Sequence, residues 1–328
     1  MERLITPLLA LGLLVVAWLS LAAGSATIPV WAGLMDWLTG EESFAATIVG
    51  DIRLPRTLIA LGVGAALGVA GAALQGLLRN PLVDPSLTGA SQGAALGAAA
   101  VFYFGLFPAA GALAPALAGL VGAGVTLMLM LYLAGPTRGA MVIMAGLAIS
   151  TIAGAALATV LNFAPNPYAM QELVFWLLGS VSERGLEYVG LLLPALVIGT
   201  AIIWSQRRLL SALSLGEEVA RSMGFDYAKG SRLVVLGTAV LVGTAVAVAG
   251  NIGFVGLMVP HLIRPLVGSR PEKLLIPAAL AGAILVCLAD ILVRSLPPGR
   301  EIKLGVLTSL IGAPLFIWLV WRERRKWL

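Results

Sequence analysis

The stretch RLPRTLIALGVGAALGVAGAALQGLLRNPLVDPSLTGASQGA, from Arg53 to Ala94, decides the fold. Its segment Thr57 to Leu78 carries no charged residue and exceeds the roughly 20 residues that a helix needs to cross a bilayer. Glycines recur at a spacing of four, and such faces let helix backbones approach closely. We therefore expect membrane-spanning helices, with these faces packed inside the chain rather than between two copies. The glycines are Gly64 and Gly68, then Gly89, Gly93 and Gly97.

The composition of the whole chain supports this expectation. Of 328 residues, 59% are hydrophobic and 11% are charged, against about 25% charged in soluble domains. We expect an all-α, polytopic membrane protein with a single domain over residues 1–328. The net charge of +5 lies in short basic clusters between apolar segments, which indicates membrane orientation and no nucleic-acid partner. Cys287, the one cysteine, lies in an apolar segment and is expected to fill space.

Charge-free segments between charged loops predict about ten membrane spans. The first resembles a signal peptide, but its length favours a span. The region from Asn251 to Val267, which includes the eighth, holds Gly253, Gly256, Pro260 and Pro265, which should break a helix, so a half-span beside a pathway is expected there. The expected spans are Leu4–Ala23, Thr57–Leu78, Leu87–Phe107, Ala112–Ala134, Gly139–Val160, Leu186–Trp204, Leu233–Ala249, Leu257–Val267, Leu274–Val293 and Gly305–Trp321.

The loops predict which side each end faces. The segment 206–232 carries five basic residues, and the tail carries Arg322, Arg324, Arg325 and Lys326. By the positive-inside rule both belong in the cytoplasm, and an even number of spans then places both termini there. The segment 25–52 has four acidic residues and no Lys or Arg, and is expected outside.

The sequence disfavours two kinds of catalytic protein. It has one histidine, His261, and one cysteine, too few for a metal centre or a nucleophile with its base. None of its four lysines belongs to a Gly-Lys-Ser or Gly-Lys-Thr phosphate loop. We expect no enzyme, no catalytic residue, and no metal or cofactor in this chain. If ATP drives its function, a partner binds the ATP and Mg²⁺.

A docking surface for such a partner is predicted in LSLGEEVARSMGFD, Leu213 to Asp226. Leu215, Val219, Ala220 and Met223 have helical spacing, and Gly224 would end the helix. A solvated connector with no special role is the alternative.

The opposite side carries basic residues against the positive-inside tendency. Arg53 and Arg56 would bind either lipid headgroups or acidic groups of an external partner. Asp290, an acid inside an apolar span, has Arg294 one helical turn away as a local partner. We favour this ion pair over a proton-coupling role for Asp290, which is the main basis for a secondary transporter. Between the second and third spans, RNPLVDPSLTGAS (Arg79 to Ser91) forms a proline-bounded turn beside a possible pathway.

Four segments in order closely resemble the permease family of iron-chelate, haem and cobalamin importers, the type II importers of the ATP-binding cassette class. They are Arg53 to Ala94, LSLGEEVARSMGF, GNIGFVGLMVPHLIR (Gly250 to Arg264), and LADILVR with GVLTSLIGAPLFIWL (Leu288 to Leu319). The resemblance covers about Thr47 to Arg325. It implies a type II ABC importer permease fold, a homodimer in the bacterial inner membrane, two cytoplasmic ATPase subunits and an external substrate-binding protein.

The resemblance also implies roles for residues. Arg53, Arg56 and Arg294 would dock the binding protein; Asn80, Leu82 and Thr137 would form gates. Lys303 stands where the family leads us to expect proline, and AGPTRG around Thr137 departs from the cobalamin permease. Residues in the coupling segment would seat in the ATPase: Leu215, Gly216, Glu217, Ala220, Arg221, Met223 and Gly224.

The cargo expected first is a ferric siderophore, with haem and cobalamin as alternatives. A proton-driven secondary transporter that uses Asp290 is a second hypothesis. A membrane-embedded enzyme is a third, and it lacks the cluster of catalytic groups that it would need.

Overall fold

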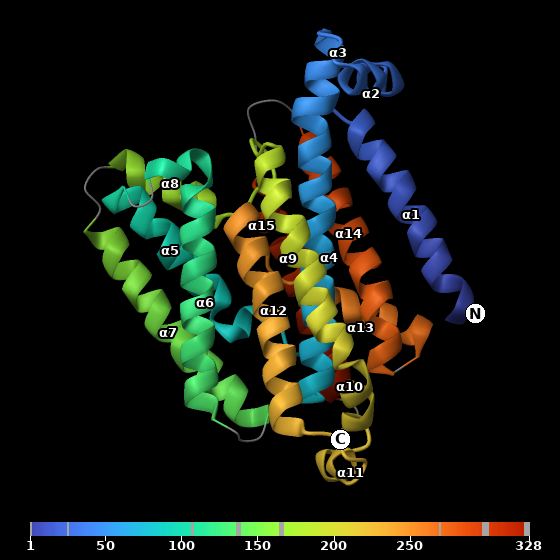
Figure 1. Cartoon of the computed structure of the whole chain (residues 1–328), viewed down its shortest axis with the longest axis vertical. Coiled ribbons are helices and arrows are strands. Elements are labelled where there is room, and N and C mark those ends of the chain that lie inside the picture. The colour runs from blue at the N-terminus through green and yellow to red at the C-terminus, as the bar shows by residue number, and fades with distance from the viewer. Residues whose placement is uncertain are drawn as a thin grey trace.

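The computed structural model describes residues 2–24, 26–105, 108–135, 139–163, 167–268, 270–296 and 302–324, which form helices and the turns between them. Each apolar segment expected from the sequence overlaps one of the main helices (Figure 1). These are α1 (Glu2–Ala22), α4 (Leu54–Leu78), α5 (Ala90–Phe104), α6 (Ala114–Ala134), α7 (Gly139–Asn162), α9 (Leu186–Ser205), α12 (Tyr227–Ala249), α13 (Val255–Val267), α14 (Pro271–Arg294) and α15 (Leu304–Arg324).

Shorter helices lie at the ends of the molecule and in the connections. At the top of Figure 1, α2 (Val30–Thr39), α3 (Phe44–Ala46) and the π-helix η1 (Thr47–Arg53) lead into α4. At the bottom lies α11 (Glu217–Ser222), next to α10 (Arg207–Leu213). The remaining ones are η2 (Pro85–Thr88), η3 (Pro108–Leu113) and α8 (Pro167–Leu177). Of these shorter helices, the sequence predicts only the one around α11.

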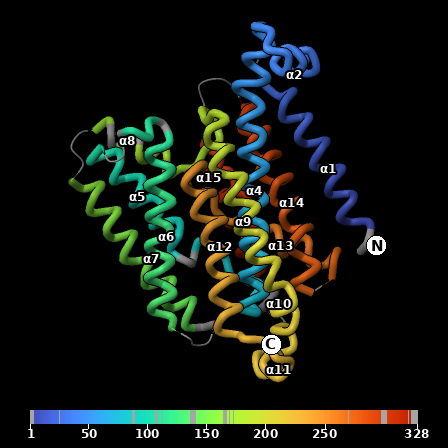
Figure 2. The backbone as a smooth tube through the Cα atoms, in the orientation of Figure 1, coloured from blue at the N-terminus to red at the C-terminus, as the bar shows by residue number. Residues whose placement is uncertain are grey.

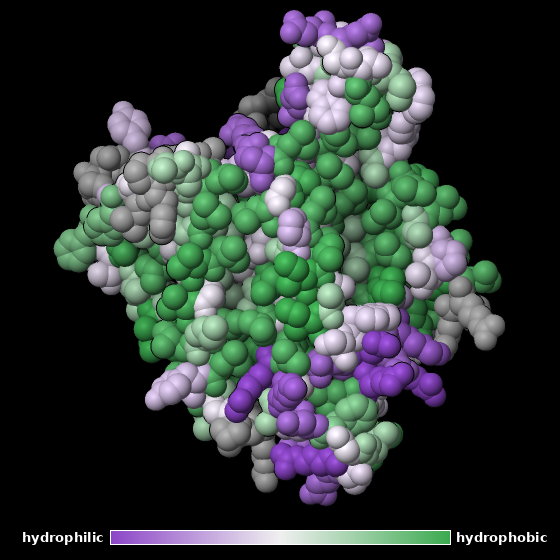
Figure 3. Space-filling view, in the orientation of Figure 1, coloured by the Kyte–Doolittle hydropathy of each residue, from purple (hydrophilic) through white to green (hydrophobic). Residues whose placement is uncertain are grey.

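Seven of the described helices are long and apolar enough to cross a membrane, and α5, α13 and the part of α15 up to Leu319 are shorter apolar helices. The all-helical membrane fold is therefore confirmed, while the described residues contain fewer full-length spans than the ten expected. Figure 3 shows a broad apolar band around the middle of this face and polar residues at both ends. This distribution is the one that a bilayer requires of a multi-helix protein.

The core is built around α4, which packs along α14 and also contacts α12, α13 and α9. A methyl group placed on Gly64 would overlap the backbone of Gly282, and one on Gly68 would overlap that of Ala278. Gly71 faces the backbone of Gly256 in the same way. The glycine face of α4 is thus buried inside the chain, as expected.

A second group of helices, α5 to α8, lies to one side of this core, with α12 between them (Figure 2). Gly93 and Gly97 of α5 face the backbone of α6, so this pair also packs within the chain. Gly89 was expected on the same face, but it precedes α5 in a left-handed conformation with φ 79°.

The half-span expected near residues 251–267 is α13, but its prolines do not break it. Pro260 and Pro265 both lie inside the helix, and the irregular backbone is confined to residues 250–254, where Phe254 has φ 66°. Pro260 has no N–H to donate to the Gly256 carbonyl. That carbonyl instead accepts a hydrogen bond from the Gln75 side chain at 3.4 Å, so the helix continues at low cost.

Candidate functional site

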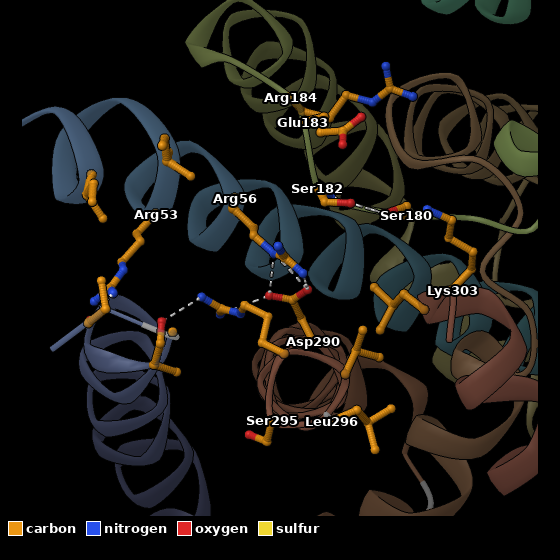
Figure 4. Close-up of a pocket in the computed structure, with 18 of the residues that line it drawn as sticks. Arg53, Arg56, Ser180, Ser182, Glu183, Arg184, Asp290, Ser295, Leu296 and Lys303 are labelled. Carbon is orange, nitrogen blue, oxygen red and sulfur yellow. Dashed lines mark hydrogen bonds and ion pairs between the residues drawn. The ribbon is translucent and has the colours of Figure 1, made fainter. Parts of the chain in front are cut away.

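The end of the molecule that carries α2 and α3 contains a cavity of about 1110 Å³. Its wall comes from segments far apart in the chain: the ends of α1 and α14, the start of α4, and the loops before α9 and α15. All three arginines assigned to docking line it: Arg53, Arg56 and Arg294. Figure 4 shows how the side chains of this wall are arranged.

An ion cluster forms the floor of this cavity. The Asp290 carboxylate accepts hydrogen bonds from Arg56 Nε at 3.0 Å and Arg56 Nη2 at 2.8 Å (Figure 4). Arg294 Nη2 lies 2.9 Å from the other carboxylate oxygen. The side chains of Asp290, Arg294 and Arg56 are 1%, 9% and 19% exposed. The structure therefore contains the expected Asp290–Arg294 pair and adds Arg56, which leaves a net charge of +1.

Arg53 and Arg294 also hold the end of α1. Arg53 donates to the carbonyl oxygens of Leu21 (2.9 Å), Ala22 (3.2 Å) and Ala26 (2.6 Å). Arg294 Nη1 donates to Ser20 O at 2.9 Å. The last carbonyls of a helix have no partner within the helix, so these bonds cap α1. Arg53 is only 5% exposed, and Arg56 is the arginine of the three whose side chain is most open to the cavity.

The other wall of the cavity has polar residues that the sequence analysis did not identify. Ser180, Ser182, Glu183, Arg184 and Lys303 line it on the side opposite Arg53 (Figure 4). They also border a second cavity of about 530 Å³ beside α8. The run SVSER between two apolar segments was the signal that could have indicated them.

The predicted coupling segment lies at the other end of the molecule and is helical. A short helix, α11, runs from Glu217 to Ser222, and Gly224 follows it with φ 86°. Leu215, Val219 and Met223 are 66%, 40% and 58% exposed, whereas Ala220 is fully buried. Arg221 and Glu217 form an ion pair at 2.6 Å on the surface. The segment thus presents an apolar stripe away from the protein, with residues spaced four apart.

The predicted gate lies in the turn that follows α4. Arg79 ends α4 in a left-handed conformation, and the Asn80 side chain accepts a hydrogen bond from Leu82 N at 2.9 Å. Asn80 is exposed and Leu82 half-buried. Thr137, the second expected constriction, lies outside the described residues. Within the part of the chain that the structure describes, no group of three or more His, Cys, Asp or Glu residues could hold a metal.

Comparison with known proteins matches this chain to one family. The model of the FecCD transport family matches residues 12–322. The chain is 38% identical to the hemin transport system permease protein HmuU of Yersinia pestis, over 99% of both chains. It is 36% identical to the cobalamin import system permease protein BtuC of Halobacterium salinarum, over 90% of this chain and 82% of that one.

A solved structure shows the same architecture. The chain superimposes with a TM-score of 0.84 and 32% identity on a metal-chelate type ABC transporter in an inward-facing conformation, over 98% of this chain and 99% of that one.

Proposed function

Because this chain belongs to the FecCD transport family, we propose that it is the membrane-spanning permease subunit of an ATP-driven importer of metal chelates. The resemblance to iron-chelate, haem and cobalamin permeases is confirmed. The chain would not hydrolyse ATP itself, and a separate ATPase would supply the energy. Its place would be the bacterial inner membrane, with the α11 end and both termini in the cytoplasm.

The observation that carries this proposal is the exposed apolar stripe of Leu215, Val219 and Met223 beside α11. Exposed apolar side chains in line on a solvated end are costly unless a partner covers them. A chain without a phosphate loop needs a nucleotide-binding partner at this end, and a short helix with an apolar face fits a groove on such a partner. Two copies of this chain and two ATPase subunits would form the importer.

The cavity at the opposite end supports docking of a substrate-binding protein. Arg56 and Arg294 keep a net charge of +1 after pairing with Asp290, so acidic groups of a partner are favoured there. Arg53, which caps α1, would act by holding the rim in shape. ATP binding and hydrolysis would then move the coupling segments and open the pathway to alternate sides.

The cargo that we propose first is a ferric siderophore, with haem and cobalamin as alternatives. The relatives include permeases named for hemin and for cobalamin, so membership of the family leaves the three open. The large cavity at the α2 end is compatible with a bulky chelate that passes from a binding protein.

The test is reconstitution in liposomes with the ATPase and the binding protein encoded by neighbouring genes. Uptake of ferrichrome, haemin or cyanocobalamin should require ATP and all three components. Arg56→Gln should weaken capture of the binding protein, whereas Glu187→Gln, a charge change on the same end, should not. Uptake without ATP would contradict the importer, and unchanged capture with Arg56→Gln would contradict the docking role.

A proton-driven transporter predicts uptake by this chain alone under a pH gradient. The geometry of Asp290 speaks against it, because a proton carrier must release its partners, while Asp290 is 1% exposed and bound by two guanidinium groups. A carboxylate with this burial and these partners is typical of a structural ion cluster.

A further inference from the structure

Gln75 is a polar residue in the last turn of the apolar helix α4, and it is only 2% exposed. An amide side chain has two N–H donors and one oxygen with two acceptor positions. A buried amide is costly unless these groups find partners. The hydrogen-bond partners of Gln75 therefore indicate which segments of the protein its side chain connects.

The Gln75 side chain joins α4 to two other segments. Its Nε2 lies 3.3 Å from Val83 O, 3.4 Å from Gly256 O and 3.3 Å from Leu257 O. Its Oε1 accepts a hydrogen bond from Arg264 Nη2 at 2.9 Å. Val83 belongs to the turn that holds the predicted gate residues, and the other three partners belong to α13. One side chain thus bonds the gate turn and the half-helix at the same time.

The carbonyl of Gly256 gives this arrangement a specific reason. In a regular helix it would accept from residue 260, but Pro260 has no N–H. The Gln75 amide supplies a donor in its place. A leucine at position 75 would leave this carbonyl and the Arg264 guanidinium without their partner, inside a packed region.

Direct packing also places the same turn against α13. The Asp84 carboxylate accepts a hydrogen bond from Ser86 N at 2.8 Å, which lies within the turn itself. A methyl group on Gly256 would overlap the ring of Pro85. Residues 83 to 85 are therefore held against the first turn of α13 by the bonds of Gln75 and by direct packing of Pro85 on Gly256.

The helix α10, which precedes the coupling segment, packs against α4 next to Gln75. The α10 side chain of Leu210, which is fully buried, lies 3.7 Å from where a methyl group on Gly76 would be. Gly76 is the neighbour of Gln75, and α10 connects directly to α11. If a partner displaced α11, α10 would move with it, and Leu210 would transmit the movement to Gly76, the residue next to Gln75.

We propose that Gln75 is a positioning residue that clamps the gate turn (residues 80–85) to the half-helix α13, so that the two move as one unit when α10 is displaced. The inference that the clamp serves transport rests on the proposed importer function, whereas the clamp itself does not. Arg264 strengthens it, because a hydrogen bond from a charged donor is stronger than one between neutral groups.

The clamp can be tested by thiol labelling in purified protein. Leu82→Cys places a thiol in the half-buried gate turn, and the native Cys287, which is 0% exposed in α14, reports global opening in the same molecule. Each variant is labelled with a maleimide in detergent, and both sites are quantified by peptide mass spectrometry. This measurement needs neither ATPase nor cargo, so its result stands even if the importer function is wrong.

With Gln75→Leu, labelling at position 82 should rise about tenfold while labelling of Cys287 stays unchanged, since several buried hydrogen bonds to the turn and α13 are lost. Thr126→Val is the matched control, because Thr126 is also buried but bonds only to carbonyls of its own helix. Thr126→Val should change neither the labelling at position 82 nor that of Cys287. Arg264→Gln, which removes only the charge-assisted bond, should give a smaller rise and serves if Gln75→Leu does not fold.

Unchanged labelling at position 82, or a rise that parallels Cys287, would overturn the clamp. In the assembled importer, Gln75→Leu should keep ATP hydrolysis but import less cargo for each ATP, measured with whichever of ferrichrome, haemin and cyanocobalamin the wild type carries. A wild-type ratio of cargo to ATP in a variant with raised labelling would overturn the link from the clamp to transport.

Discussion

Replacement of Asp290 by asparagine should be among the most damaging single changes at the α2 end of the protein. The variant keeps the shape of the side chain but removes its charge, and it leaves Arg56 and Arg294 facing each other without a counter-charge. Loss of one partner of a buried ion pair costs about 3–5 kcal/mol. Because the Arg56 side chain is 19% exposed, we expect about 3 kcal/mol, at the lower end of that range.

A second ion pair in the same chain provides the control. Glu217 and Arg221 have the same spacing of four residues and a contact of 2.6 Å, but the Arg221 side chain is 60% exposed. Exposed pairs of this kind contribute about 0.3–0.5 kcal/mol, so Glu217→Gln should have little effect. The contrast is between a buried carboxylate that binds two guanidinium groups and an exposed carboxylate that binds one.

The assay is equilibrium unfolding in mixed micelles with increasing SDS, followed by tryptophan fluorescence. Asp290→Asn should lower the free energy of unfolding several times more than Glu217→Gln. Adding Arg56→Gln to Asp290→Asn should restore part of the loss, because it removes one of the two facing charges. Equal effects of Asp290→Asn and Glu217→Gln, or no recovery in the double variant, would refute the reasoning.

Other predictions test single contacts. Arg53→Ala should lower the free energy of unfolding by about 2 kcal/mol in the same SDS assay, because carbonyls at the end of α1 lose charged donors; an effect below that of Glu217→Gln would contradict the capping role. Met223→Asp should abolish co-purification of the ATPase without changing the unfolding midpoint, and retained co-purification would count against the apolar stripe as its docking surface. Gly64→Val should prevent accumulation of folded protein, measured by gel filtration in detergent, since its side chain would overlap the α14 backbone; a normal yield would show that α4 and α14 can separate.

The helices were predictable from the sequence because the signal for each is local. An uninterrupted apolar segment has to be satisfied within itself in a membrane, so its length and composition predict a helix. The same reasoning misses short helices that lack such a segment. One is α2, which carries Asp36, and another is α8, which has only 11 residues. Neither has the long apolar run on which the prediction depends.

The error at Pro260 has a different origin. Proline breaks a helix when the carbonyl that it leaves free finds no other donor. Here Gln75, 181 residues away from Gly256 in sequence, supplies that donor. Sequence spacing gives no access to such a contact, although a glutamine inside an apolar span was itself a signal that a polar partner lies nearby.

The candidate sites are also of two kinds, those set by local sequence and those set by contacts between distant segments. The stripe of Leu215, Val219 and Met223 follows from periodicity within a few residues, so its exposure could be expected. The role of Arg53 depends on the end of α1, about 30 residues earlier in the chain, and pairing of Arg56 with Asp290 spans 234 residues. These contacts are set by how helices assemble, which a single sequence does not reveal.

The direct backbone contact of α4 with α13 and α14 affects how the protein tolerates change. Where large side chains separate two helices, a new methyl group is accommodated by repacking of those side chains at a cost of about 1–3 kcal/mol. At Gly64, Gly68 and Gly71 the neighbouring atoms are main-chain atoms, which have no rotamers to adjust. Any added volume must be taken up by the distance between helix axes. We therefore expect these positions to require glycine, whereas the exposed apolar residues of α1 and α7 should tolerate substitution.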